Sequence, residues 1–167
     1  MQHPFSRPLM HHIASGPAPT RSKWYGFPGI LVLLMLAGCQ NQEFEQASGE
    51  TLEWESLRGQ WVLVNYWAGW CRPCLEEIPE LNSLNRSGSV VVLGVNFDDV
   101  KGQSLIDLGE KMGIEYAMLA EDPGPDLGWQ LPVGLPVTFV VDPQGNLKEA
   151  LFGQQTEEDF KNALIRE

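Results

Sequence analysis

Cysteine and histidine are both scarce in this chain of 167 residues, with three of each. All three histidines lie within the first 12 residues, and only two of the cysteines, Cys71 and Cys74, lie close together in the sequence. A zinc site needs about four ligands, drawn mostly from cysteine and histidine. The sequence therefore argues against a metal site at this pair. Covalent haem attachment is also excluded, because Leu75 rather than a histidine follows Cys74.

Positive charge is the second shortage. All 22 acidic residues lie after residue 38, but only 8 of the 11 basic residues do, which gives this part of the chain a net charge of −14. A surface with this charge repels nucleic acid and anionic lipid headgroups. We therefore expect no nucleic-acid partner and no membrane binding through charge.

What the chain does contain is a Cys-x-x-Cys motif, Trp70-Cys71-Arg72-Pro73-Cys74, directly after the apolar run 61–67. At a junction between a strand and a helix, the free amides and the dipole of the helix N-terminus face the first sulfur. They lower the pKa of a thiol, and the thiolate is its reactive form. Pro73 suits the first helical turn. The motif predicts a redox-active pair; a structural disulfide is the alternative, although a loop of four residues brings little chain-entropy benefit.

The first 38 residues are expected to be a signal peptide outside the fold. They carry three basic residues and no acidic one, followed by the apolar stretch 30–37, which is too short to span a bilayer. Leu36-Ala37-Gly38-Cys39 resembles a bacterial lipobox, with Cys39 as the lipidated residue. An ordinary signal peptide that contains a cysteine is the alternative, and translation from Met10 stays open.

An exported lipoprotein facing the periplasm follows from this interpretation, with the acyl chains on Cys39 as its membrane anchor. Gln40 resembles the outer-membrane sorting pattern and slightly favours that membrane over the inner one. Residues 39–50, rich in Gln, Asn, Glu, Ser and Gly, are expected to form the lipidated cysteine and a flexible tether. Residues 51–167 would then form one domain.

The hydrophobic pattern after the tether predicts an α/β fold. The expected elements are a short strand or turn at 52–57, strands at 61–67, 90–97, 116–120, 136–141 and 147–152, helices at 71–85 and from 98 to 113, and a last helix opened by a capping box at Thr156. Pro79 is expected to kink the first helix. Asp98-Asp99 is expected to cap the second. This order predicts a central mixed sheet flanked by helices on both faces.

These segments resemble the thioredoxin-like fold, and specifically the membrane-anchored TlpA/ResA-type thiol-disulfide oxidoreductases of bacteria. The matching segments are 64–74 with Glu77 and Pro79, Gly94-Val95-Asn96, the block 134–142, Gly145 and Gly153. Their order and spacing cover about residues 50–165. The Cys-x-x-Cys motif alone is moderately specific, but together with the distant Leu-Pro-Val-Thr-Phe block the resemblance is strong.

The resemblance implies a role for each residue of the motif. Cys71 would be the exposed nucleophile and Cys74 the resolving thiol, with no cofactor beyond this disulfide. A cis Leu135–Pro136 bond would lie opposite the pair and expose backbone to the substrate. Trp70 would cover part of the same docking surface. Arg72 would stabilise the thiolate unless it is only a solvent-facing residue.

Glu77 fits the Cys-x-x-Glu-x-Pro pattern of the family, which implies a proton-handling role. Burial near a thiolate would raise the pKa of its carboxyl. Glu76 is expected on a solvated helix face, whereas Trp61 and Trp67 are expected in the core. Asn65 stands where classical thioredoxin has a buried aspartate, and this difference favours the TlpA/ResA branch.

A lipid-anchored reductase of protein disulfides in the cell envelope is the function that the resemblance implies. Its targets would be apocytochrome c or misformed disulfides, and its electrons would come from a membrane donor of the DsbD/CcdA type. The alternatives are an oxidase or isomerase on the same scaffold, a peroxidase, whose Pro-Thr-x-x-Cys pattern is missing, and a non-catalytic binding module. A monomer is expected, because no coiled-coil pattern or long apolar stripe is evident.

Overall fold

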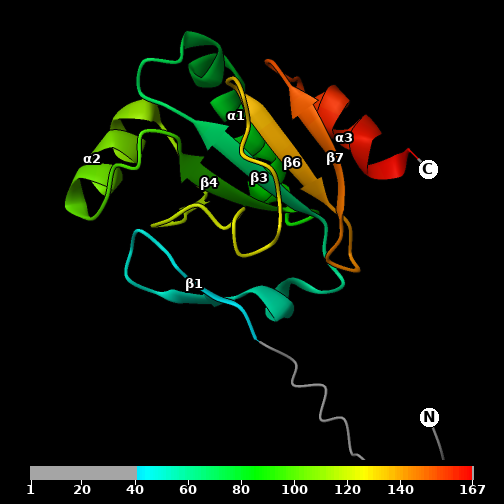
Figure 1. The fold of residues 1–167 in the computed structure, drawn as a ribbon. Helices are drawn as coiled ribbons and strands as arrows, with labels where there is room; N and C mark the ends of the chain where they lie inside the picture. Colours follow the sequence, from blue (N-terminus) through cyan, green and yellow to red (C-terminus); the bar gives the residue numbers. More distant parts are fainter. Residues whose placement is uncertain (1–40, 167) are drawn as a thin grey trace, which may run out of the picture. The chain divides into compact units, whose positions relative to one another are not determined.

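The computed structural model describes residues 41–166, and a five-stranded mixed sheet lies at their centre (Figure 1). The strands are β3 (Val62–Trp67), β4 (Val91–Asn96), β5 (Ala117–Met118), β6 (Val137–Val141) and β7 (Leu147–Phe152), in the order β5-β4-β3-β6-β7. β4 runs parallel to both β3 and β5, while β6 is antiparallel to β3 and to β7. The sheet confirms the predicted thioredoxin-like α/β class.

The first face of the sheet is covered by α1 (Arg72–Ser87) and α3 (Glu157–Ile165). Leu81 of α1 and Phe160 of α3 pack with Leu63 of β3 and Val140 of β6, and all four are fully buried. α1 continues past Pro79 and ends at Gly88, whose φ of 69° is the left-handed conformation that glycine adopts without steric cost. The predicted capping box opens α3 at Thr156.

The second face is covered by an N-terminal hairpin and a short 3₁₀-helix. The hairpin consists of β1 (Glu43–Glu45) and β2 (Thr51–Glu53), and η1 (Trp54–Leu57) follows it directly. Phe44 and Trp54 from these elements pack into the same cluster as Val64 and Phe139 of the sheet. The single-turn η1 is therefore the helix that covers this face, whereas we expected longer helices on both faces of the sheet.

This hairpin also corrects the predicted tether. Residues 43–50 lie in the segment that we expected to be flexible, but here they form one strand and the turn that joins it to the next. The physical reason is Phe44, which is 8% exposed and anchors β1 to the core despite its polar neighbours. The signal peptide, Cys39 and Gln40 lie outside the described residues, so the interpretation of them stays a prediction.

α2 (Gln103–Met112) packs through Leu105 and Leu108 against the cluster that contains Trp67 and the two cysteines. It ends at Gly113 as expected, but it begins at Gly102 without a side-chain cap, so the predicted cap at Asp98-Asp99 is wrong. The side chain of Asn96 accepts the amides of residues 98 and 100 instead and forms a turn there. Within residues 41–166 no helix is long and apolar enough to cross a membrane.

Candidate functional site

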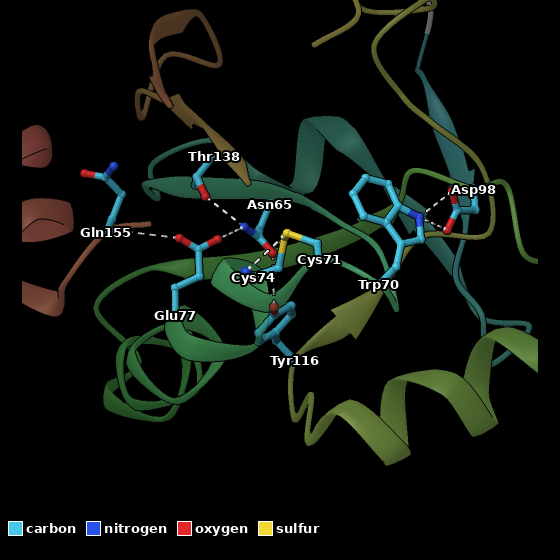
Figure 2. The surroundings of a disulfide bond; sticks show 9 residues. All are labelled: Asn65, Trp70, Cys71, Cys74, Glu77, Asp98, Tyr116, Thr138 and Gln155. Atoms are coloured by element: carbon cyan, nitrogen blue, oxygen red, sulfur yellow. Dashed lines mark hydrogen bonds between the residues drawn. A yellow bond between two sulfur atoms is a disulfide. The ribbon is translucent and has the colours of Figure 1, made fainter. Parts of the chain in front are cut away.

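The two cysteines form a disulfide where β3 gives way to α1, with 5.3 Å between their Cα atoms (Figure 2). Cys71 is the N-cap of α1, and its sulfur accepts the amide N–H of Cys74 at 3.3 Å. Cys71 is only 3% exposed and Cys74 is fully buried, so the expected exposure of the first cysteine is wrong for this disulfide form. Both cysteines pack with Trp67 and Leu105 in one buried cluster.

The helix N-terminus acts directly on the sulfur of Cys71. The Cys74 amide is one of the donors that no earlier turn of the helix can satisfy, so it is free to bind the sulfur. After reduction, the same donor and the helix dipole would stabilise a thiolate at this position. Pro73 lies in the first helical turn, as expected. Arg72 is strongly exposed and pairs with the exposed Glu76 at 3.4 Å, so part of its charge is compensated.

Trp70 projects from the surface beside the disulfide. Its side chain is 67% exposed, and its Nε1 donates to both carboxylate oxygens of Asp98 at 3.0 and 3.1 Å. Leu135 is half-buried and packs against the cysteine cluster, and the Leu135–Pro136 bond is cis, in agreement with the resemblance. Pro136 itself is buried. The predicted docking residues therefore lie beside the disulfide, but only Trp70 is widely exposed.

Glu77 lies on the opposite side of the disulfide from Trp70 (Figure 2). Its side chain is 1% exposed, one carboxylate oxygen accepts Nδ2 of Asn65 at 2.7 Å, and the other accepts the amide of Gln155 at 3.1 Å. Burial raises the pKa of this carboxyl from its ordinary 4.5 to about 7, although the two hydrogen bonds act in the opposite direction. A carboxyl with this pKa can both release and accept a proton near neutral pH.

Three further residues near Glu77 were not predicted as site residues. They are Asn65, Thr138 and Tyr116. The side-chain amide of Asn65 donates to Thr138 at 2.9 Å in addition to Glu77, and its oxygen accepts the hydroxyl of Tyr116 at 3.3 Å. All three residues are buried. The signal available in the sequence was an asparagine inside the apolar run 61–67, because a buried amide needs hydrogen-bond partners.

A cavity of about 330 Å³ opens beside the carboxyl ends of β3 and β4. Its apolar wall includes Val95 and Leu131, and acidic side chains including Glu121 and Asp122 line it as well. Asp122 accepts the hydroxyl of the buried Tyr66 at 2.7 Å. The sequence did not predict this cavity, because the residues that line it come from β3, β4, the loop after β4 and the segment between β5 and β6.

Comparison with known proteins agrees with this geometry. The chain is 42% identical over 101 residues to the thiol:disulfide interchange protein HelX of Rhodobacter capsulatus. The aligned region covers 60% of this chain and 56% of HelX. It is 28% identical over 122 residues to the thiol-disulfide oxidoreductase ResA of Bacillus thuringiensis, covering 70% of this chain and 68% of ResA. These relatives support the resemblance to the TlpA/ResA type.

Among solved structures, a secreted thiol-disulfide isomerase of Corynebacterium glutamicum shares the fold with a TM-score of 0.62. The match has 20% identity and covers 75% of this chain and 81% of that one. The sequence also matches the AhpC/TSA family over residues 37–150. Because this match spans more than half of the sequence, the chain belongs to the AhpC/TSA family of thioredoxin-fold proteins.

Proposed function

We propose that this protein is a thiol-disulfide oxidoreductase that reduces protein disulfides. In the reduced protein, the Cys71 thiolate attacks one sulfur of a substrate disulfide, and the second substrate sulfur leaves as a thiolate. The Cys74 thiolate then attacks the mixed disulfide and releases the first substrate sulfur. The substrate gains two electrons and two protons, and the Cys71–Cys74 disulfide seen here is the oxidised product.

The single observation that carries this proposal is the Cys71–Cys74 disulfide at the N-terminus of α1, where the Cys71 sulfur accepts a helix amide. A purely structural disulfide does not need this placement, since a loop of four residues adds little stability. The names of HelX and ResA favour the same chemistry. An oxidase or isomerase would use the same two sulfurs, and only the reduction potential separates it from a reductase.

In the same proposal, Glu77 handles the proton of the buried sulfur. Cys74 is fully buried, so its thiol has no direct access to solvent. Glu77 lies one helical turn after Cys74 and has a pKa of about 7, so it can accept the thiol proton as Cys74 attacks. Trp70, Leu135 and Pro136 would form the surface on which the substrate docks.

The cellular setting completes the proposal. The lipobox-like segment ending at Cys39 supports anchoring of an exported protein to a membrane, with Gln40 favouring the outer membrane. Continued reduction in an oxidising compartment would need an electron donor, and a membrane protein of the DsbD/CcdA type would supply it. Maturation of cytochrome c is the pathway in which we place the substrate, and the protein would act as a monomer without a further cofactor.

The reduction potential tests the proposal. A soluble form that begins after Cys39 is equilibrated with glutathione or dithiothreitol, with tryptophan fluorescence as the readout. A potential at or below about −220 mV supports a reductase, whereas a value near −120 mV indicates an oxidant. The Cys71→Ser variant should show no two-electron couple. A wild-type protein without a reversible couple would leave only a binding module.

A further inference from the structure

Asn65 is the only side chain that donates a hydrogen bond to Glu77 among the described residues, and every polar atom of its amide is used. Nδ2 donates to Glu77 at 2.7 Å and to Thr138 at 2.9 Å, and Oδ1 accepts the Tyr116 hydroxyl at 3.3 Å (Figure 2). The residue is fully buried on the central strand. Water therefore cannot replace any of these partners at low cost.

The sheet register explains how Tyr116 reaches this amide. Asn65 of β3 pairs with Gly94 of β4, which in turn pairs with Met118 of β5. A Cβ at Gly94 would lie 3.1 Å from the ring of Tyr116, which is a tight contact. Because glycine has no side chain, the Tyr116 ring can lie across β4 and bring its hydroxyl to β3. On the other side of Asn65, Thr138 is its direct partner in β6.

Tyr116 and Glu77 together favour the observed orientation of the Asn65 amide, because the hydroxyl donates to Oδ1 and the carboxylate accepts from Nδ2. If the amide turned over, its oxygen would face the Glu77 carboxylate, and its nitrogen would face the tyrosine hydroxyl. The hydroxyl of Tyr116 has a donor hydrogen for Oδ1, and burial raises the tyrosine pKa, so the hydroxyl stays protonated. The donor group of Asn65 is thus held toward Glu77.

We propose that Asn65, oriented by Tyr116, is a positioning residue that holds Glu77 in its ionisable arrangement and so sets the pH range of thiol-disulfide exchange. The inference rests on the proposed function, because it assigns the proton-handling role to Glu77. It goes beyond that function by extending the machinery to two residues that touch neither sulfur in the described contacts. Both lie outside α1: Asn65 is on β3, and Tyr116 directly precedes β5.

The physical basis is a balance of opposing effects on Glu77. Burial disfavours its charge, while the donors from Asn65 and from the amide of Gln155 favour it. The other titratable groups around Glu77 come from three elements. Cys74 lies on the same helix, and Tyr116 lies in the segment before β5. A group of acids lies near the start of α3, where the amide of Glu157 donates to Glu80 of α1. These acids are Glu80, Glu157, Glu158 and Asp159, and none of them contributes to the shift at Glu77. Removing the Asn65 donor should therefore move the balance toward the neutral form.

Three variants test the inference in the oxidised protein, in which the cysteines do not titrate. Asn65→Leu removes the donor but keeps a similar volume, and Tyr116→Phe removes only the hydroxyl that orients it. Tyr66→Phe is the matched control, because it removes a buried tyrosine hydroxyl bonded to Asp122 and not to Asn65. The readout is the titration of the Glu77 carboxyl carbon by NMR, with the resonance assigned by its loss in Glu77→Gln.

The midpoint of Glu77 is expected to rise by about one pH unit or more in Asn65→Leu, since a hydrogen bond to a charged group is among the stronger ones. It should rise by a few tenths of a pH unit in Tyr116→Phe and stay unchanged in Tyr66→Phe. The pH profile of the exchange rate should move by the same amounts. If Asn65→Leu does not fold, Tyr116→Phe against Tyr66→Phe still decides the question.

The failures can be told apart. An unmoved Glu77 midpoint in both variants would overturn the inference, whatever the activity. A midpoint that moves while the rate profile stays fixed would also overturn it, because Glu77 would then not set the pH range. A wild-type protein with no exchange activity would instead refute the proposed function, and the NMR titration would still report whether Asn65 acts on Glu77.

Discussion

Replacing Glu77 with glutamine should remove a pH dependence of stability that arises from the buried carboxyl. Glutamine has the same shape but cannot ionise, so it imitates the neutral acid. The folded protein raises the pKa of Glu77 from 4.5 to about 7 by burying it. Because the pKa of the folded state is the higher one, the folded protein binds the proton more tightly, and stability is lost as the pH rises from about 4.5 through about 7.

The magnitude follows from the difference between the two pKa values. Each pKa unit corresponds to about 1.4 kcal/mol, so a carboxyl with this change costs the folded state about 3 kcal/mol above pH 8 and almost nothing below pH 4. The free energy of unfolding of the wild-type protein should therefore fall by about 3 kcal/mol relative to Glu77→Gln over this range. Any hydrogen bond that glutamine loses adds an offset at all pH values and leaves this slope unaffected.

Urea denaturation of the oxidised protein at several pH values between 4 and 8.5 measures the effect. Glu76→Gln is the matched control, because it removes an exposed carboxylate at the adjacent position of the same helix. The free energy of unfolding of Glu76→Gln should change with pH in the same way as that of the wild-type protein. If Glu77→Gln also ran parallel to the wild type across the whole range, burial would not raise the pKa of Glu77, and its proposed proton-handling role would lose its basis.

Three further outcomes are expected. Cys74→Ser should accumulate a mixed disulfide with a protein substrate, visible on non-reducing gels, whereas Cys71→Ser should not, because Cys71 is the proposed nucleophile; equal trapping by both variants would contradict this assignment. Lys148→Met should lower the free energy of unfolding by about 1 kcal/mol, because the Lys148 ammonium donates to the carbonyl oxygens of Ala163 and Arg166 at the C-terminal end of α3. Lys161→Met removes an exposed lysine of α3 and is the control; an equal effect there would argue against a stabilising role of these two bonds. Gly94→Ala should cost about 1–3 kcal/mol in the same assay, because its new methyl would lie 3.1 Å from two buried aromatic rings, and a neutral result would mean that the rings move aside.

Local pattern was sufficient for most of the elements. The apolar runs 61–67 and 90–97 became β3 and β4 within one residue at either end, because strands buried on both faces need apolar residues throughout. The periodicity after Cys71 predicted α1. The first strand of the hairpin at 43–53 was missed, because Phe44 is the one hydrophobic residue of β1 and polar residues surround it.

For the site, local spacing predicted which residues lie together but not how deeply they are buried. Cys71, Pro73, Cys74 and Glu77 lie within seven residues, so helical spacing alone brings them to one end of α1. The burial of Cys71 was not predictable from this spacing, because α2 and the cysteine cluster that cover it depend on the tertiary fold.

The sequence by itself determined the redox motif, the order of the strands and helices and the resemblance to a thioredoxin-like family, because each is encoded by residues close together in the chain or by a spaced pattern. Only the tertiary structure decided the surroundings of Glu77. Asn65 and Tyr116 are 51 residues apart, and they meet because the parallel register of β3, β4 and β5 brings them together over Gly94. Burial and hydrogen bonding from distant strands determine the charge of a carboxyl, and neither is visible in a linear sequence.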